Sequence, residues 1–118
     1  MTVEDIQNIC NKLPHVTEDI KWENNLCFLV GGKIFLMVGL DHVPSNASFK
    51  VDEEEFQALT DRDGFVQAPY MAKNKWVLIE DINKMKPKEW EYYIKKSYEI
   101  IKSKLSMKKL KEMEENRI

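Results

Sequence analysis

The sequence predicts an α+β fold, a two-layer sandwich made of an antiparallel sheet and a layer of helices. The longest apolar run, residues 26–40, is broken by Gly31-Gly32, and two strand-like runs around a Gly-Gly pair are typical of a tight hairpin. Apolar residues recur at helical spacing near both ends of the 118-residue chain, which is long enough for one domain with a real core. We therefore expect N-terminal and C-terminal helices on one face of the sheet, together with a short inserted helix.

The composition limits the classes of partner. A formal net charge of −2 gives no overall attraction to nucleic acid or to an anionic membrane, so any affinity for phosphate must come from a local patch. The acidic start MTVEDIQN has no apolar segment of a signal peptide, and no apolar run reaches the roughly 18 residues of a membrane span. Cys10 and Cys27 form no CxxC motif. We expect them to be free, buried thiols in a cytoplasmic protein without membrane contact.

The first half of the chain predicts a helix followed by strands. Thr2 is placed to cap a helix that ends before Pro14, and its apolar stripe consists of Val3, Ile6, Ile9, Cys10 and Leu13. Residues 16–22 follow as an edge strand, and the hairpin of residues 26–40 comes next. Residues 41–46 form a loop, and residues 48–51 return as a strand.

The second half predicts the inserted helix, one more strand and a long helix. Asp52 opens the short helix, with Glu55 at the capping-box position, and residues 65–70 form a connector before a strand at 76–81. Pro87 is suited to the first turn of a long helix. Helical spacing continues through Leu105, and four lysines lie in its C-terminal half, namely Lys102, Lys104, Lys108 and Lys109. We expect one domain over residues 1–106 and a charged tail over 107–118, fraying from residue 112.

Side-chain alternation assigns the faces of the sheet. In the second hairpin strand, Ile34, Leu36, Val38 and Leu40 point inward, whereas Lys33, Phe35, Met37 and Gly39 point outward. The same rule places Phe49, Val51, Val77 and Ile79 inward and Ser48, Lys50 and Trp76 outward. Lysines between exposed aromatic rings can hold a phosphate backbone and stack bases. Alternatively, Phe35 and Trp76 pack under the connector and the lysines lie over them; spacing alone favours this second arrangement.

An ordered set of short segments resembles one family. These segments are Leu13-Pro14, Gly32-Lys33-Ile34-Phe35, Phe49-Lys50, Gly64-Phe65, Ala68-Pro69-Tyr70, Lys73, Trp76-Val77 and Ser97-Tyr98. The chain is thereby similar to the MmcQ/YjbR family of small bacterial proteins. The resemblance implies a CyaY-like (frataxin-like) fold and DNA binding through a double-wing arrangement of strands. The family's characteristic positions fall on Lys33, Phe35, Lys50, Tyr70, Trp76, Ser97 and Tyr98. Where relatives often have a basic residue before the tryptophan pair, this chain has Asn74-Lys75, so the charge is kept there but shifted in kind.

Two functional hypotheses follow. The first is a DNA-binding module, and the second is a domain that binds a protein or a small ligand on the same face or in a pocket at Pro69-Tyr70. The candidate binding residues are Lys33, Phe35, Lys50, Tyr70, Lys73, Lys75 and Trp76. Affinity that falls steeply with salt would favour the first hypothesis, and salt-insensitive binding centred on Trp76 would favour the second.

Other chemistry has little support in the sequence. His15 and His42 are far apart and lack metal-ligand spacing, and there is no P-loop or GxGxxG motif. Ser97 lies in the predicted long helix without a visible base partner, so we expect its hydroxyl to bond to the preceding turn. Tyr93 and Tyr98 are expected at the edge of the core. We therefore expect neither catalysis nor a cofactor or metal.

Overall fold

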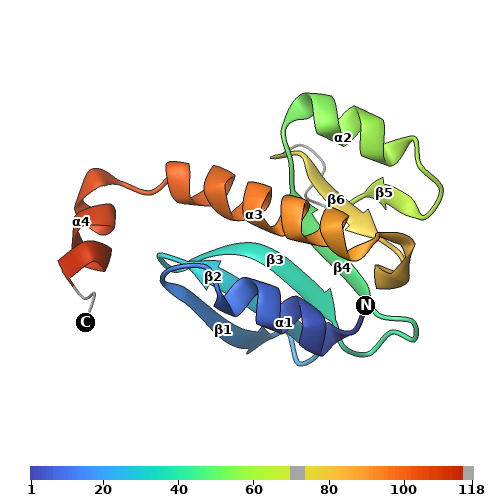
Figure 1. Ribbon diagram of the computed structural model, residues 1–118, viewed down its shortest axis with the longest axis horizontal. Helices are drawn as coiled ribbons and strands as arrows, with labels where there is room; N and C mark the ends of the chain where they lie inside the picture. The colour runs from blue at the N-terminus through green and yellow to red at the C-terminus, as the bar shows by residue number, and fades with distance from the viewer. Residues whose placement is uncertain (70–73, 116–118) are drawn as a thin grey trace.

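A computed structural model of the chain, which describes residues 1–69 and 74–115, shows helices packed on one face of a single sheet (Figure 1). The helices are α1 (Val3–Asn11), α2 (Glu53–Thr60), the 3-10 turn η2 (Ile82–Lys84), α3 (Pro87–Ser103) and α4 (Met107–Glu115). The strands are β1 (Val16–Lys21), β2 (Asn25–Val30), β3 (Lys33–Gly39), β4 (Asn46–Lys50), β5 (Phe65–Gln67) and β6 (Trp76–Ile79). The six strands are ordered β1-β2-β3-β4-β6-β5, and every neighbouring pair is antiparallel. The predicted α+β class is confirmed.

Helix α1 forms as its sequence predicts and is tied to the edge strand β1. Thr2 Oγ1 accepts a hydrogen bond from the Asp5 amide at 3.1 Å, and the Asp5 carboxylate accepts one from the Thr2 amide at 2.9 Å. These bonds lower the pKa of Asp5. From the other side of the helix, Gln7 and Asn11 each donate to Glu18 of β1 at 3.3 Å. The charges at the start of α1 therefore serve the helix end itself.

The core lies between α3 and the middle of the sheet. The Phe49 ring of β4 meets the rings of Trp90 and Tyr93, with centroids 5.9 and 5.6 Å apart. Trp90 Nε1 donates to the Ile82 carbonyl at 2.8 Å, which satisfies its buried donor. Both cysteines are free and buried, as predicted, and burial raises the pKa of each thiol.

A β-bulge in β3 changes the predicted faces of the hairpin. Phe28 pairs with Leu36 but Leu29 pairs with Ile34, so Phe35 is an extra residue in β3. In such a bulge both residues opposite the single partner lie on the same face. Phe35 therefore turns toward the helices with Leu36, while Ile34 moves to the outer face with Leu29. The inward prediction for Ile34 and the outward predictions for Phe35 and Lys33 were wrong, because alternation shifts by one residue at the bulge and Lys33 pairs with the inward-facing Val30. Leu40, also predicted inward, follows the end of β3 and is 42% exposed.

Two further elements differ from the expectation. The predicted connector contains β5, which pairs with β6, and a strand of three residues is too short to show alternation. The predicted single long helix is divided at residues 104–106. Ser106 Oγ accepts a hydrogen bond from the Lys109 amide at 3.1 Å and so caps a separate helix, α4. Residues 112–115, expected to fray, belong to that helix.

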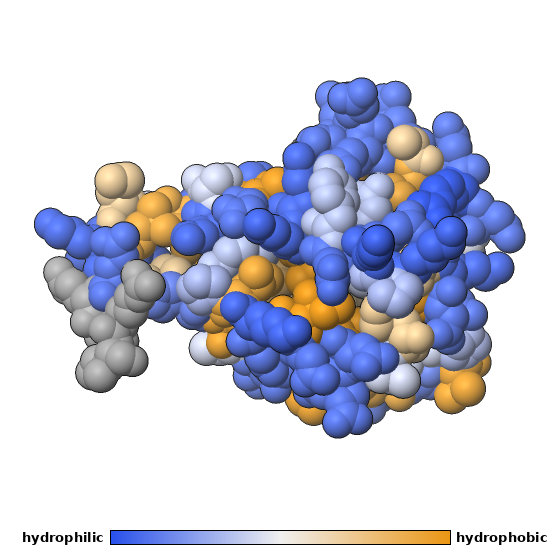
Figure 2. Space-filling model, in the orientation of Figure 1, coloured by the Kyte–Doolittle hydropathy of each residue, from blue (hydrophilic) through white to orange (hydrophobic). Residues whose placement is uncertain are grey.

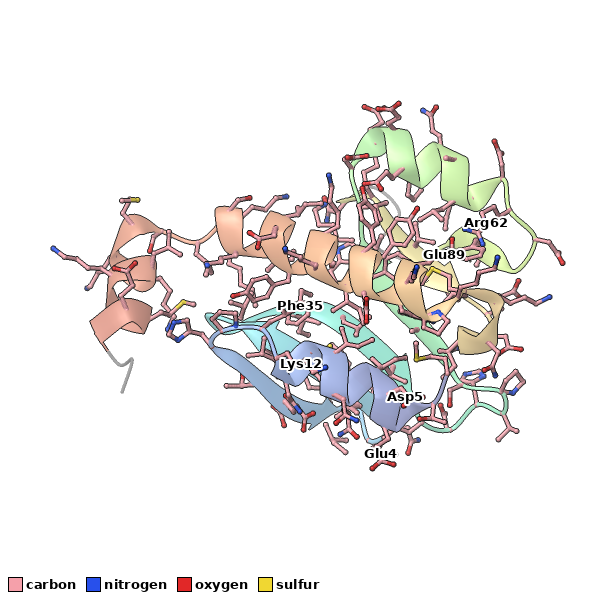
Figure 3. The ribbon with its side chains drawn as sticks, viewed as in Figure 1. Glu4, Asp5, Lys12, Phe35, Arg62 and Glu89 are labelled. Atoms are coloured by element: carbon pink, nitrogen blue, oxygen red, sulfur yellow. The ribbon has the colours of Figure 1, made fainter. Side chains whose placement is uncertain are left out.

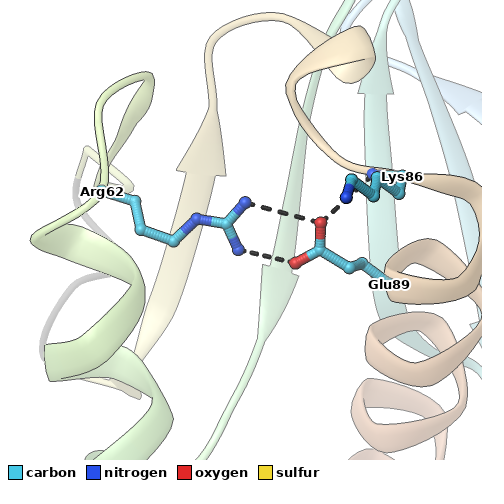
Figure 4. Close-up of polar contacts among 3 residues, drawn as sticks. All are labelled: Arg62, Lys86 and Glu89. Carbon is cyan, nitrogen blue, oxygen red and sulfur yellow. Dashed lines mark hydrogen bonds and ion pairs between the residues drawn. The ribbon is translucent and has the colours of Figure 1, made fainter.

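Ion pairs join α2 to α3 on the helix side of the molecule. Arg62 Nη1 lies 2.7 Å from Glu89 Oε2, and its Nη2 lies 3.5 Å from Oε1 (Figure 4). Hydrogen bonding from Arg62 lowers the pKa of Glu89 and raises the pKa of Arg62. Further along α3, Lys96 lies 3.4 Å from Asp52 and 3.7 Å from Glu55. These contacts fix α2 beside α3, and hydrophilic residues cover α2 in the space-filling view (Figure 2).

The opposite face of the sheet carries no helix in the part of the chain that the structure describes. A row of paired residues crosses this open face on five strands, namely Cys27, Met37, Ser48, Leu78 and Val66. The outward prediction is thus confirmed for Met37 and Ser48.

Within residues 1–69 and 74–115, none of the helices combines the length and the apolar character that a bilayer span requires.

Candidate anion-binding site

Three lysines are neighbours where β4 ends, and we call Lys50, Lys75 and Lys104 the lysine cluster. The Lys75 carbonyl accepts a hydrogen bond from the Val51 amide at 3.0 Å, next to Lys50, and the charges of Lys104 and Lys75 both act on the Lys50 ammonium. Lys50 is the last residue of β4 and pairs across the sheet with Trp76, and its ammonium donates to the Asn74 carbonyl. Lys75 precedes β6 in a left-handed conformation with φ of 63°, and its ammonium lies 5.1 Å from the centre of the Phe56 ring. Lys104 caps the C-terminus of α3.

The lysine cluster holds positive charge that no described carboxylate neutralises. Only 7% of Lys50 is exposed. Burial lowers the pKa of its ammonium first, and the neighbouring Lys104 and Lys75 lower it further. None of the three lysines takes part in an ion pair among residues 1–69 and 74–115. Like charges held together in this way favour an anion between them, because the anion would relieve their repulsion.

Ser97 of α3 fixes the end of β4 that carries Lys50. Its Oγ accepts a hydrogen bond from the Lys50 amide at 3.0 Å and donates to the Phe35 carbonyl at 2.5 Å. The bulge has removed Phe35 from the regular ladder, and the hydroxyl spans the resulting gap between β3 and β4. The prediction that Ser97 bonds to the preceding helical turn was wrong, since both its donor and its acceptor capacity serve the sheet.

The aromatic part of the predicted surface is buried. Phe35 is 0% exposed, and it lies between β3 and α3 with its ring 5.5 Å from the ring of Tyr98 (Figure 3). Trp76 is on the outer face, as predicted, but only 6% of it is exposed. Tyr98 is fully buried and not at the core edge, and its hydroxyl donates to the Pro14 carbonyl at 2.7 Å. Neither Phe35 nor Trp76 presents a free ring face for stacking.

The other predicted site residues divide into two groups. Lys33 is exposed at the start of β3, at the same end of the sheet as Lys50, because β3 and β4 are antiparallel. Tyr70 and Lys73, and with them the expected pocket at Pro69-Tyr70, lie outside the described residues. The predicted set therefore keeps Lys50 and Lys75 together and brings Lys33 to the same end.

Lys104 is the cluster member that the sequence analysis did not assign to the site. It follows Ser97 by two helical turns and Ile101 by one. Both Ser97 and Ile101 are buried against the rest of the protein, so helical spacing also directs residue 104 toward the sheet side. This periodicity is the signal that could have placed Lys104 beside Lys50.

Comparison with known proteins identifies the family. A family model named YjbR matches residues 11–100. The chain belongs to the YjbR family. A search of curated proteins finds no match. Among solved structures, protein DR2400 of Deinococcus radiodurans, described with domain DUF419, superposes with a TM-score of 0.84 at 22% identity, covering 95% of this chain and 87% of that one. A protein from Pseudomonas syringae superposes with a TM-score of 0.70 at 19% identity, covering 85% and 98% respectively. At these identities the likeness shows the shared fold.

Proposed function

We propose that this YjbR-family protein binds nucleic acid through the phosphate backbone, with the lysine cluster as the point of contact. The observation that carries the proposal is the convergence of Lys50, Lys75 and Lys104 without a described carboxylate partner. Lys33 is a further exposed lysine at the same end of the sheet. The DNA-binding role that the family resemblance implies agrees with this charge distribution.

The mode of binding follows from which groups are accessible. Since Phe35 and Trp76 are buried, the described residues offer phosphate contacts and no stacking platform at this point. Contacts to phosphate position a protein on nucleic acid without reading its sequence. We therefore expect weak, sequence-independent binding of DNA that depends strongly on salt.

The test is a titration of a fluorescently labelled DNA duplex, followed by anisotropy at several salt concentrations. Each phosphate contact contributes about −0.9 to the slope of log K against log salt, so three lysines predict a slope of roughly −2 to −3. A variant with Lys75→Ala and Lys104→Ala should lose most of the affinity at low salt. Its slope should become shallower by about 2.

The matched control is a variant with Lys12→Ala and Lys95→Ala. Both residues are exposed, Lys12 at the C-cap of α1 and Lys95 within α3, and the variant loses the same positive charge without touching the lysine cluster. The proposal requires the control to bind nearly as well as the natural protein. Equal losses in the two variants, or no anisotropy change even at low salt, would show that the cluster is not a DNA contact.

The open sheet face supports a second candidate, an apolar protein partner. Met37 and Leu78 lie in the row that crosses this face, where both are partly exposed, and a flat face is better suited to a protein than to a small ligand. Such binding would be insensitive to salt and would be lost when Leu78 is changed to Asp. The lysine variants would leave it unchanged, so the two candidates are separable.

A further inference from the structure

A hollow of about 410 Å³ lies between α4 and the turn that joins α1 to β1. Its apolar wall is formed by Pro14, Met107, Leu110 and Met113. Met113 is 8% exposed and forms the floor, whereas Met107 is 81% exposed at the mouth. Figure 2 shows apolar surface at this junction of α3 and α4, with hydrophilic residues on either side. The size is within the range of small-molecule sites, and methionine side chains adapt to ligands of varied shape.

The polar groups of the hollow are two basic side chains and one carboxylate. Lys102, in the last turn of α3, lines it together with His15 and Glu114. The Lys102 ammonium lies 5.6 Å from the centre of the Tyr98 ring, and this cation–π contact holds it in place. Among the described residues the Lys102 ammonium forms no ion pair. An ammonium beside an apolar wall suits a ligand with one negative charge and a hydrocarbon body. Glu114 disfavours a second negative charge.

The backbone of His15, in the turn that borders the hollow, is in a left-handed conformation. His15 has φ of 64°, in the left-handed region that costs a residue with a side chain about 1–2 kcal/mol. Strain of this kind gathers at ligand sites, where the surrounding structure maintains it. The same imidazole also lines a neighbouring hollow of about 320 Å³ beneath α4, which it shares with Met113.

We infer that the hollow of about 410 Å³ between α4 and the turn that joins α1 to β1 binds a small amphipathic monoanion, a medium-chain carboxylate. Lys102 and His15 contact its carboxylate, and the methionines contact its hydrocarbon chain. The site depends on Lys102 and α4, which lie beyond the 11–100 span of the family model. It is also separate from the lysine cluster. Carboxylate binding therefore stands or falls independently of DNA binding.

The test is calorimetric titration of the full-length protein with decanoate, compared with decylamine of the same chain length. Decanoate should bind and decylamine should bind at least tenfold more weakly, because the amine brings a positive charge to Lys102. Lys102→Met should lower the decanoate affinity about tenfold, the usual size of a lost charge-assisted hydrogen bond. Glu114→Gln should leave decanoate binding intact or strengthen it.

Two further variants keep the test decisive. Lys108→Met removes an exposed lysine of α4 that does not line the hollow, so it should bind decanoate normally. His15→Gly removes the imidazole and is suited to the positive φ at this position, so it should fold well and bind decanoate more weakly. Equal binding of decanoate and decylamine, or equal losses in Lys102→Met and Lys108→Met, would overturn the inference, as would the absence of decanoate binding.

Discussion

The Ser97 hydroxyl is a hydrogen-bonding group that the two strands beneath it cannot replace. The bulge at Phe35 leaves a carbonyl of β3 and the Lys50 amide of β4 too far out of register to pair directly, and Ser97 joins them. A sequence shows a serine at a sheet-facing helical position, but it does not show a bulge. The outward predictions for Phe35 and Lys33 failed for this reason. The pairing of β4 with β6 has no bulge, so Lys50 and Trp76 keep the predicted alternation, but both side chains are buried.

Replacing Ser97 with Ala should therefore lower the free energy of unfolding by about 2 kcal/mol, because a buried amide and a buried carbonyl lose their partner. Urea denaturation followed by circular dichroism measures the change. Ser103→Ala is the matched control, since the Ser103 hydroxyl is exposed and bonds only to the Ile100 carbonyl of its own helix. The control should change the free energy by less than about 0.5 kcal/mol, and an equal loss in both variants would contradict the role of Ser97.

At the scale of elements, the hairpin turn at Gly31 lies against Leu105, between α3 and α4, and against Met113, near the end of α4. The division of the long helix was not predicted, because apolar spacing continues across it from Leu105 to Leu110 and Met113. Ser106 provides a capping side chain, but a serine inside a helical pattern is an ambiguous signal. Periodicity therefore predicted that the C-terminal segment is helical, but not the break that divides it where it contacts the turn.

Gly31 and Gly32 form a matched pair that measures this contact. Both have positive φ, so an alanine at either position carries a similar backbone cost. A methyl group on Gly31 would lie 2.6 Å from Leu105 Cδ1, whereas one on Gly32 meets nothing within 4 Å. We expect Gly31→Ala to be less stable than Gly32→Ala by about 1 kcal/mol in thermal or urea unfolding. The difference should shrink when Leu105 is also changed to Ala, and its persistence would show another cause.

The pair of Arg62 and Glu89 predicts how the contact between α2 and α3 responds to pH. Because Arg62 lowers the pKa of Glu89 below its ordinary value of 4.5, the folded state binds a proton there less readily than the unfolded chain. The stabilisation is therefore fully present above that value and is lost as the pH falls through the lower folded pKa.

Glu89→Gln should lower the free energy of unfolding at pH 7 by at most about 1 kcal/mol, since both partners are partly exposed. The difference from the natural protein should vanish toward pH 3 in urea titrations. Glu91→Gln, exposed on the same helix, provides the control and should show no such dependence. A constant difference across the pH range would mean that the ion pair is not its source.

At the scale of the whole molecule, the sequence predicted the layers better than the site. Helix caps, the Gly-Gly turn and apolar spacing are local signals, and together they defined the antiparallel sheet with its helices. The site depends on where chain segments distant in sequence meet. Lys50 and Lys104 are 54 positions apart by their numbering, and no local pattern of either residue identifies the other as its neighbour. Net charge was equally uninformative, because an acidic total conceals a basic cluster.

The Ser97 bond also has a consequence for cooperativity. The Phe35 carbonyl of β3 and the Lys50 amide of β4 are linked through the Ser97 hydroxyl of α3. Both backbone groups therefore lose their hydrogen-bond partner whenever α3 is displaced. Neither layer can open alone without exposing unpaired polar groups of the other at the centre of the protein. The sandwich is in this respect a single cooperative unit, because the Ser97 hydroxyl links α3 to both strands in addition to the aromatic packing between the layers.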